Sequence, residues 1–369
     1  MQKEVKGESR LKRQLRSGEK HQYSIHLEPG EFAHIRVQQY DIDVMILLTS
    51  DTGNLQEIYD SPTGELDKED IFVLSKRDGN FKIEIYPAQK YADPGEYDLN
   101  IVVLRIATEG DRKWMAAIAA TQKADKLRST PATRQQSMAQ YEASLLLWSE
   151  LKARDQYAGT LRSLGFVYIR EKNYDKAIGV FNKLLPIWKE IGDLRAEGFT
   201  HLIIGRIYNL QKDYNTSLAY NLNSLPIWKT AKDTDQESFV MMNVGNLYAQ
   251  LGDKQKAIDF FEQALKRNET SKRPSIKAVI LRDFGTAMIL VGEAEKGIQL
   301  YVLSMKQWQS TVNAPEEART AVLLGNHFAG KNDQLQANQY YNHSMEIWHK
   351  LDDLNEIQKV KVLLDRLKK

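Results

Sequence analysis

Two patterns of apolar and polar residues divide the chain. From residue 9 to residue 107 apolar residues alternate with polar ones, as in Tyr23, Ile25 and Leu27, and this is the period of half-buried β-strands. After residue 107 apolar residues recur at spacings of three and four among good helix formers, which indicates amphipathic α-helices. The chain is therefore predicted to be a multidomain β + α protein, in which a β domain precedes an all-α domain.

Turn sequences divide the first region at short intervals, among them Pro29-Gly30, Asp78-Gly79 and Asp93-Pro94-Gly95. Between the turns, strands are expected at residues 9–16, 20–27, 32–39, 42–49, 55–60, 70–76, 80–86 and 96–105. Short strands at this spacing predict an antiparallel β-sandwich or jelly roll over residues 9–107, after an N-terminal tail of residues 1–8.

The second region repeats itself every 40 residues, since the segment LPIWKE at residues 185–190 returns as LPIWKT at residues 225–230. Five tryptophans follow the same period, namely Trp148, Trp188, Trp228, Trp308 and Trp348. Asn268 occupies the one position of this series that lacks a tryptophan. A second series consists of Gly165, Gly205, Gly245, Gly285 and Gly325. Self-similarity at a fixed period predicts a solenoid of stacked helix pairs.

Each glycine is followed at fixed distances by two further positions. Twelve residues on stands a small residue, at Ala177, Ser217, Ala257, Gly297 and Ala337, and four residues later stands Phe181, Asn221, Phe261, Tyr301 or Tyr341. A glycine inside a helix costs about 1 kcal/mol relative to alanine. We therefore expect the partner helix to approach closely at each glycine.

Short polar turns are expected to end one helix and cap the next. They read Lys172-Asn173, Lys212-Asp213, Gly252-Asp253, Gly292-Glu293 and Asn332-Asp333. The helical domain is thus predicted to comprise a degenerate repeat at 108–153 with Asp125 at the glycine position, five regular repeats at 154–353, and a capping helix at 354–369.

The tryptophan series has two interpretations. A ladder of indole rings could hold a ligand, but a tryptophan near the end of each second helix is better placed to cover the junction with the next repeat, and we expect these side chains to be core residues. Asn268 interrupts the series, and Met288 replaces the aromatic residue of the following helix. This junction is expected to be either the least well packed point, a candidate hinge, or a simple local variant.

These motifs resemble known families. The order apolar-Gly-x-x-aromatic, then small, then aromatic is the signature of the tetratricopeptide repeat. The phrases GEKHQYSIHLEPGEFAHIRVQQYDIDVMILL and GNFKIEIYP resemble the bacterial pre-peptidase C-terminal domain, a jelly roll usually found on exported proteins. A sandwich followed by 40-residue repeats, with phrases like those at 145–148 and 185–193, is similar to bacterial proteins that carry a caspase-like CHAT peptidase after the repeats.

The tetratricopeptide resemblance implies that a partner binds in the concave groove lined by the first helix of each repeat. The residues expected to face this groove are Arg162, Phe166, Ile169, Ile203, Arg206, Asn209, Asn243, Asn246, Arg282, Asp283, Thr286, Asn326 and, at its edge, Arg319. Asn243 and Asn246 look like the groove asparagines of related arrays, whose amides hold a peptide backbone. The arginines could pair with carboxylates of an acidic peptide, although an exposed helix face carries polar residues in any case.

Composition narrows the functional classes. Lysine plus arginine (51) nearly balances aspartate plus glutamate (49), so nucleic acid is not an expected partner. The chain contains no cysteine, and no G-x-S-x-G, H-E-x-x-H, Walker or G-x-G-x-x-G motif, so no catalytic residue, cofactor or metal site is predicted. No apolar run is long enough to predict a membrane span.

The main functional hypothesis is a non-enzymatic protein-interaction scaffold that binds a partner peptide or helix in its groove. The alternative is the regulatory N-terminal part of a longer CHAT-type cysteine peptidase whose catalytic domain lies outside this chain. A weaker possibility is calcium or glycan binding by the sandwich, for which the carboxylates are Asp41, Asp43, Asp60, Asp67, Glu69 and Asp70. The pre-peptidase resemblance favours an extracytoplasmic location, periplasmic or secreted, over a cytoplasmic one; the oligomeric state is left open.

Overall fold

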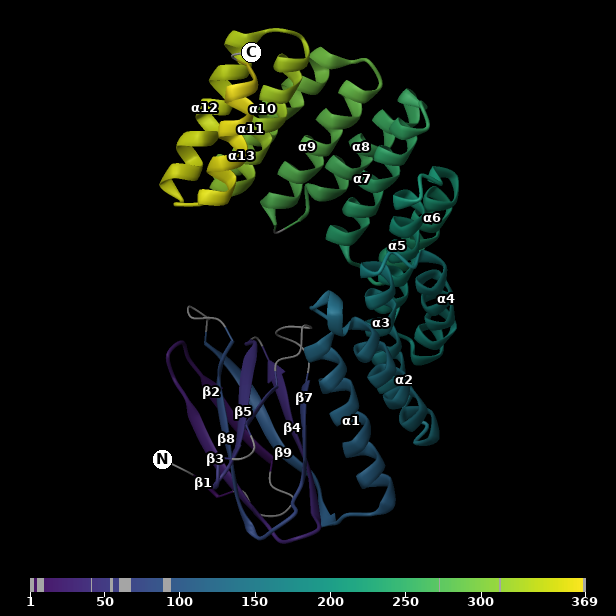
Figure 1. Ribbon diagram of the computed structural model, residues 1–369, viewed down its shortest axis with the longest axis vertical. Coiled ribbons are helices and arrows are strands. Elements are labelled where there is room, and N and C mark those ends of the chain that lie inside the picture. Colours follow the sequence, from purple (N-terminus) through teal and green to yellow (C-terminus); the bar gives the residue numbers. More distant parts are fainter. Residues whose placement is uncertain are drawn as a thin grey trace. The chain divides into compact units, whose positions relative to one another are not determined.

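The computed structural model describes residues 3–4, 10–40, 42–53, 56–59, 68–88, 94–271, 273–311 and 313–367. The chain divides into two compact units, residues 1–160 and residues 161–369. The first unit contains the predicted sandwich and the first helices, and the second contains the other helices (Figure 1). The two-sheet β region followed by a helical solenoid confirms the predicted fold class.

The strands of the first unit form two sheets. Their bounds are β1 (Lys3–Glu4), β2 (Arg10–Leu15), β3 (His21–Leu27), β4 (Glu31–Tyr40), β5 (Val44–Ser50), β6 (Gln56–Tyr59), β7 (Lys68–Leu74), β8 (Gly79–Pro87) and β9 (Gly95–Ile106). One sheet has the order β1-β3-β8-β5-β6 and the other β2-β9-β4-β7. All these neighbours are antiparallel except β1 and β3, which pair in parallel. Strand β1 falls within the predicted tail, whose sequence has no alternating apolar pattern.

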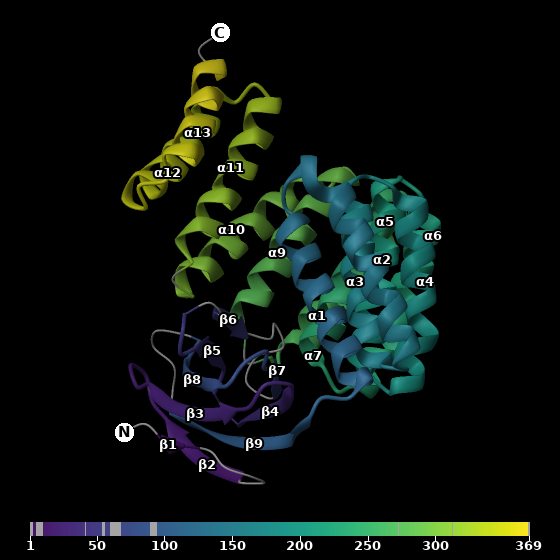
Figure 2. The same cartoon turned by 60° about the horizontal axis from the view of Figure 1, so that its bottom comes forward.

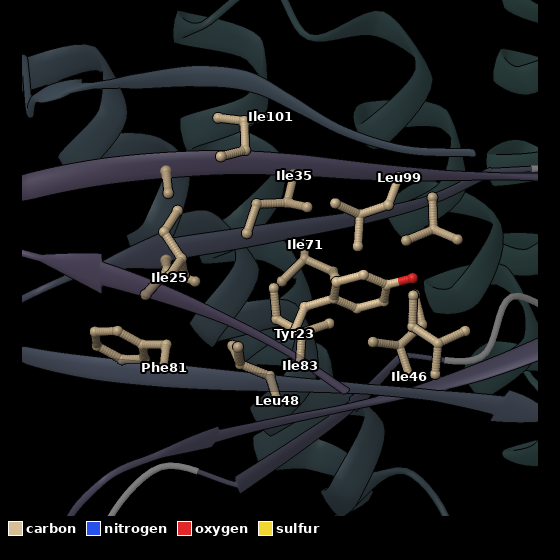
Figure 3. Packing of buried hydrophobic residues seen from close by; sticks show 14 of the residues in the cluster. Tyr23, Ile25, Ile35, Ile46, Leu48, Ile71, Phe81, Ile83, Leu99 and Ile101 are labelled. Carbon is tan, nitrogen blue, oxygen red and sulfur yellow. The ribbon is translucent and has the colours of Figure 1, made fainter. Parts of the chain in front are cut away.

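The alternation of apolar residues builds the sandwich core. Inward-facing side chains of both sheets are fully or almost fully buried, for example Ile25 of β3, Ile35 of β4 and Ile83 of β8 (Figure 3). Removing each such side chain from water contributes about 1.5–3 kcal/mol to folding. The hydrophobic effect on alternate residues therefore fixes the register, because a slip of one residue would turn each strand inside out.

Helices α1 (Glu109–Leu127) and α2 (Arg134–Glu150), with a short 3-10 turn, η1 (Pro131–Thr133), between them, follow the sheets in the first unit. Trp114 of α1 contacts Phe72 of β7 at a ring-centroid distance of 5.5 Å and Trp148 of α2 at 4.9 Å. Thr108 caps α1 with a reciprocal capping box to Asp111. Helix α1 thus packs on the sandwich, and α2 packs on α1, although the sequence predicts a domain boundary at residue 107.

The regular repeats consist of antiparallel helices that lie side by side in sequence order (Figures 1 and 2). Their bounds are α3 (Arg154–Arg170), α4 (Tyr174–Ile191), α5 (Leu194–Leu210), α6 (Tyr214–Thr230), α7 (Thr234–Gln250), α8 (Lys254–Asn268), α9 (Pro274–Leu290), α10 (Ala294–Ser310), α11 (Ala314–Gly330), α12 (Gln334–Lys350) and α13 (Leu354–Leu367).

The turns between helices repeat one local structure. A residue in the left-handed conformation, such as Lys212 at φ 63° or Gly252 at φ 80°, ends a helix. The next residue, such as Asp213 or Asp253, accepts a hydrogen bond from the backbone N–H three residues later and so caps the following helix. The predicted turns are confirmed except that Glu293 makes no side-chain cap.

Each series glycine lies against its partner helix, as expected. A Cβ atom added to Gly165, Gly245 or Gly325 would lie 2.8, 2.8 or 2.5 Å from the ring of Phe181, Phe261 or Tyr341. The three rings come from the second helix of the same repeat and are buried. The absent side chain therefore makes room for the aromatic ring, and this contact joins the two helices of a repeat.

The tryptophans of the series are core residues, because each is at most 6% exposed. The Trp228 indole lies on Gly198 of its own repeat, where an added Cβ would come within 2.6 Å of the ring. The same indole belongs to a buried cluster with Val240 and Val244 of the next repeat. The indoles thus join neighbouring repeats, as predicted.

The structure does not support a hinge at Asn268. This side chain is 5% exposed, and Met288 is fully buried. One hydrophobic cluster runs from α7 through α8 and α9 to Leu300 of α10, and within it Phe261 stacks on Phe284 at 4.6 Å. Packing is therefore continuous across this junction, and Asn268 is a local variant.

Gly245→Ala should lower the free energy of unfolding by about 1–3 kcal/mol, because the new methyl group would overlap the Phe261 ring. Gly179→Ala is the matched control, since Gly179 also lies in a helix and an added Cβ would meet no atom within 4 Å. The control should gain up to about 1 kcal/mol from helix propensity. Urea unfolding of both variants checks this, and equal effects would contradict the packing role of the glycine.

The sandwich should lose stability in acid through Asp70. Burial raises the pKa of this carboxyl, but hydrogen bonds from His34 and Arg36 lower it further, to about 2. The resulting stabilisation, on the order of 2 kcal/mol, is present above the ordinary pKa and disappears as the pH falls toward 2. The difference in unfolding free energy between wild type and Asp70→Asn should therefore shrink from pH 5 to pH 2; a constant difference would contradict the assignment.

Candidate partner-binding groove

A cavity of about 530 Å³ opens between the second and third repeats. We call it the second-repeat cavity. Helix α5 contributes Phe199, Leu202, Ile203, Arg206 and Asn209; α6 contributes Ser217 and Asn221; α7 contributes Phe239, Asn243, Asn246, Leu247 and Gln250. The cavity therefore combines apolar walls with a ring of hydrogen-bonding groups, as ligand sites commonly do.

Five of the predicted groove residues line this cavity, namely Ile203, Arg206, Asn209, Asn243 and Asn246. They come from the first helices of consecutive repeats, at positions one residue after the glycine, four after it or two before it. Arg206 and Asn209 are exposed, and Asn243 is half-buried. Within the described part of the chain, these three side chains form no hydrogen bond or ion pair, so their donors and acceptors are available to a ligand.

The predicted groove residues Arg282 and Asp283 of the fourth repeat pair with other side chains of the chain. The Arg282 guanidinium pairs with Asp283 at 3.1 Å and with Glu316 of the next repeat at 2.7 Å. Asn246 donates to Asp283 at 3.4 Å. Arg282 is thus already paired with carboxylates of the chain itself, and its pairing with a partner carboxylate stays a prediction.

The remaining predicted residues lie away from the second-repeat cavity. Arg162 and Phe166 are exposed on α3, and the Phe166 ring contacts Phe181 edge-on at 5.6 Å. Asn326 accepts a hydrogen bond from the Tyr341 hydroxyl at 2.8 Å. The Phe166 and Asn326 side chains thus contact residues of their own repeats.

The cavity lies where the second repeat departs from the pattern of the others. Asn221 stands where the first, third, fourth and fifth repeats have Phe181, Phe261, Tyr301 and Tyr341. Ser217 stands where those repeats have alanine or glycine. The asparagine side chain is smaller than these rings, and the cavity borders it.

Both departures place polar atoms at the inner end of the cavity. Asn221 is 4% exposed, and its Nδ2 donates to the Ser217 carbonyl at 2.8 Å. The Ser217 hydroxyl is buried, and among the described residues it has no hydrogen-bond partner. An unpaired buried hydroxyl is unfavourable, so a ligand group that bonds to it would gain free energy from this contact.

Sequence reasoning missed Phe199 and Phe239, which line the same cavity from equivalent positions 40 residues apart. They are 45% and 40% exposed, unusual for phenylalanine. The equivalent positions of the other regular repeats hold Gly159, Val279 and Arg319. A comparison of the repeats at this position, together with Ser217 and Asn221, would have singled out this part of the array.

The structure gives no support to a calcium site in the sandwich. Asp41, Asp60 and Asp67 lie outside the described residues. Asp70 is held by His34 and Arg36, and Gln39 donates to Glu69 at 3.3 Å. Among the described residues, no group of three histidine, aspartate or glutamate side chains is placed to hold a metal ion.

Comparison with known proteins supports the repeat. Residues 198–270 match the family model of the tetratricopeptide repeat, a range that covers most of the second and third repeats and every lining residue of the second-repeat cavity. Such repeats are typically non-catalytic and bind other proteins. No curated protein matches the chain. Across the described residues, no helix has both the length and the apolar character needed to cross a membrane.

Solved structures are similar to parts of the chain at low identity. The apo form of RapI is 17% identical, with 66% of each chain covered and a TM-score of 0.49. BtubC from P. vanneervenii is 16% identical, with 56% of this chain and 93% of that chain covered and a TM-score of 0.43. The pre-peptidase C-terminal domain of collagenase from Bacillus anthracis is 14% identical, with 27% of this chain and 94% of that domain covered and a TM-score of 0.24.

Ser217→Ala should raise the free energy of unfolding by about 1 kcal/mol, because it removes a buried hydroxyl without a partner. Ser304→Ala is the matched control, since its buried hydroxyl donates to the Ala278 carbonyl at 2.8 Å, and it should lower stability by about the same amount. Thermal unfolding of the two variants measures this contrast. A loss of stability in Ser217→Ala would show that the hydroxyl is satisfied within the protein.

Proposed function

We propose that the protein is a non-enzymatic protein-interaction scaffold whose helical array binds an extended or helical segment of a partner protein. The segment would lie along α5 and α7 and cover the second-repeat cavity. The observation that carries the proposal is the set of Arg206, Asn209 and Asn243, which are accessible and have no hydrogen-bonding partner in the described chain, around this cavity.

The polar groups suit a polypeptide backbone. A side-chain amide offers a donor and an acceptor together, and a peptide bond needs both. Asn209 and Asn243 come from helices of adjacent repeats, so two successive peptide units of a bound segment could be held by different repeats. Arg206 adds a charge-assisted donor that favours a carbonyl or a carboxylate of the segment.

The apolar groups supply contact area. Phe199 and Phe239 are partly exposed at equivalent places on α5 and α7. Exposed aromatic side chains beside polar groups are typical anchor points of protein interfaces, where a few residues contribute most of the binding energy. The combination of phenylalanines with polar side chains also distinguishes this surface from an ordinary exposed helix face, which carries mainly polar residues.

The role of the sandwich and the setting of the protein are further proposals. The sandwich would serve as a docking or surface-attachment module, in agreement with its resemblance to pre-peptidase C-terminal domains. That resemblance favours an extracytoplasmic location. A continuation into a CHAT-type peptidase stays a prediction, which the gene sequence after residue 369 would test.

Arg206→Glu should weaken binding of groove ligands about tenfold to a hundredfold, because a charge-assisted hydrogen bond contributes about 1.5–3 kcal/mol. The probes are 12-residue peptides selected from a random display library on the full-length protein. Their affinities are then measured by fluorescence polarisation with the wild type and the variant.

Lys183→Glu is the control, because Lys183 is exposed on α4, outside the second-repeat cavity, and the substitution changes the net charge equally. It should leave the affinities within about twofold. Failure to select any peptide, or equal weakening by both variants, would overturn the proposed function.

A further inference from the structure

The second repeat lacks an internal aromatic side chain that every other regular repeat supplies. Phe181, Phe261, Tyr301 and Tyr341 each lie against the glycine of their own repeat. In the second repeat this position is Asn221, whose Nδ2 would lie 2.7 Å from a Cβ added to Gly205. The asparagine thus keeps the contact with the glycine, occupies less space than a ring and borders the second-repeat cavity.

The fourth and fifth repeats show which side chain fits this position. In the fourth, the Tyr301 hydroxyl lies 2.9 Å from the Thr286 hydroxyl, and in the fifth the Tyr341 hydroxyl donates to Asn326 at 2.8 Å. Thr286 and Asn326 are the residues directly after the series glycines. The equivalent residue of the second repeat is Arg206, which lines the cavity and has no partner among the described residues.

The second-repeat cavity has the volume and the combination of apolar and polar lining groups that a tyrosine side chain requires. The cavity measures about 530 Å³ and bears the partly exposed rings of Phe199 and Phe239. At its inner end, the Ser217 hydroxyl and the Asn221 Oδ1 accept no hydrogen bond from any described residue. Aromatic walls with polar atoms at the inner end match an amphipathic aromatic side chain, in which an apolar ring ends in a hydroxyl.

We propose that the bound partner segment inserts one tyrosine side chain into the second-repeat cavity, where it takes the place of the missing internal aromatic residue. Its ring would lie between Phe199 and Phe239, and its hydroxyl would bond to Ser217, Asn221 or Arg206. The second repeat is then the specificity-determining repeat of the array. This inference rests on the proposed function, because the tyrosine belongs to the same bound segment.

A phenylalanine would fill the space but leave the buried hydroxyl of Ser217 unpaired. An aspartate or glutamate would pair with Arg206 but leave Phe199 and Phe239 in contact with water. A site built to hydrogen-bond a hydroxyl discriminates strongly against ligands that lack it. A tyrosine satisfies the ring position, the aromatic walls and the inner polar atoms together.

The test uses the full-length protein and peptides selected on it from a random 12-residue display library. Tyrosine should be enriched at one position of the selected peptides. Replacing it by alanine should weaken binding about 30-fold or more, as for an interface anchor, and replacing it by phenylalanine about five- to tenfold, as for one lost hydrogen bond.

Asn221→Phe restores the pattern of the other repeats and fills the cavity from within. It should raise the thermal stability of the protein and lower the affinity of a tyrosine peptide to that of its alanine version, whose own affinity should change by less than about twofold. Asn223→Phe is the control, because this exposed position lies two residues away on α6, outside the cavity; it should leave both affinities unchanged.

The outcomes separate this inference from the proposed function. Peptides that depend on Arg206 but contain no preferred tyrosine, or whose affinity Asn221→Phe leaves unchanged, would overturn the tyrosine pocket and leave the scaffold function standing. Peptide exchange of tyrosine for alanine tests the pocket without altering the protein, so the test holds even if Asn221→Phe fails to fold. Absence of any selected peptide would overturn both proposals.

Discussion

The contact between an aromatic ring on the second helix and a glycine on the first is the interaction on which the array depends. It lets two helix backbones approach where a side chain would overlap the ring, as Phe261 does on Gly245 and Tyr341 on Gly325. The cost of glycine inside a helix is offset by burial of the ring. Indoles such as Trp228 then join each helix pair to the next repeat. Each repeat contacts only its neighbours, so the same contact can recur in four of the five regular repeats.

A repetitive structure makes its exceptions informative. Where four repeats place a ring, the second places Asn221, and a cavity bordered by two unusually exposed phenylalanines occurs at that point. Asn221 buries less apolar surface than a phenylalanine or tyrosine would, and a repeat with only a structural role gains nothing from this loss of packing. Binding sites often carry such local departures from optimal packing, which the rest of the fold compensates. The proposed site is therefore built by omission of a core residue and addition of surface aromatics.

Periodic features were predictable from the sequence, and pairings between particular side chains were not. Strand β3 was expected at 20–27 and runs from His21 to Leu27, because its alternation of apolar residues is unambiguous. The helical period of the sequence alone predicts that Arg206 and Asn243 face the groove. The same helical period predicts that Arg282 faces the groove, yet its guanidinium pairs with Glu316 of the next repeat. This contact joins residues 34 positions apart, and it depends on side-chain geometry that periodicity does not specify. The sequence does not predict Phe199 and Phe239 as groove residues, because a phenylalanine on a helix is ordinarily a core residue.

The most direct test of the account is methyl NMR of the isoleucine-labelled full-length protein, titrated with a peptide selected on it. Ile203 lines the second-repeat cavity, whereas Ile258 belongs to the core cluster around α8. The account predicts that the Ile203 methyl signal shifts on saturation with peptide and that the Ile258 signal does not. A bound peptide that shifts Ile258, or isoleucines of the sandwich, and leaves Ile203 unchanged would contradict it.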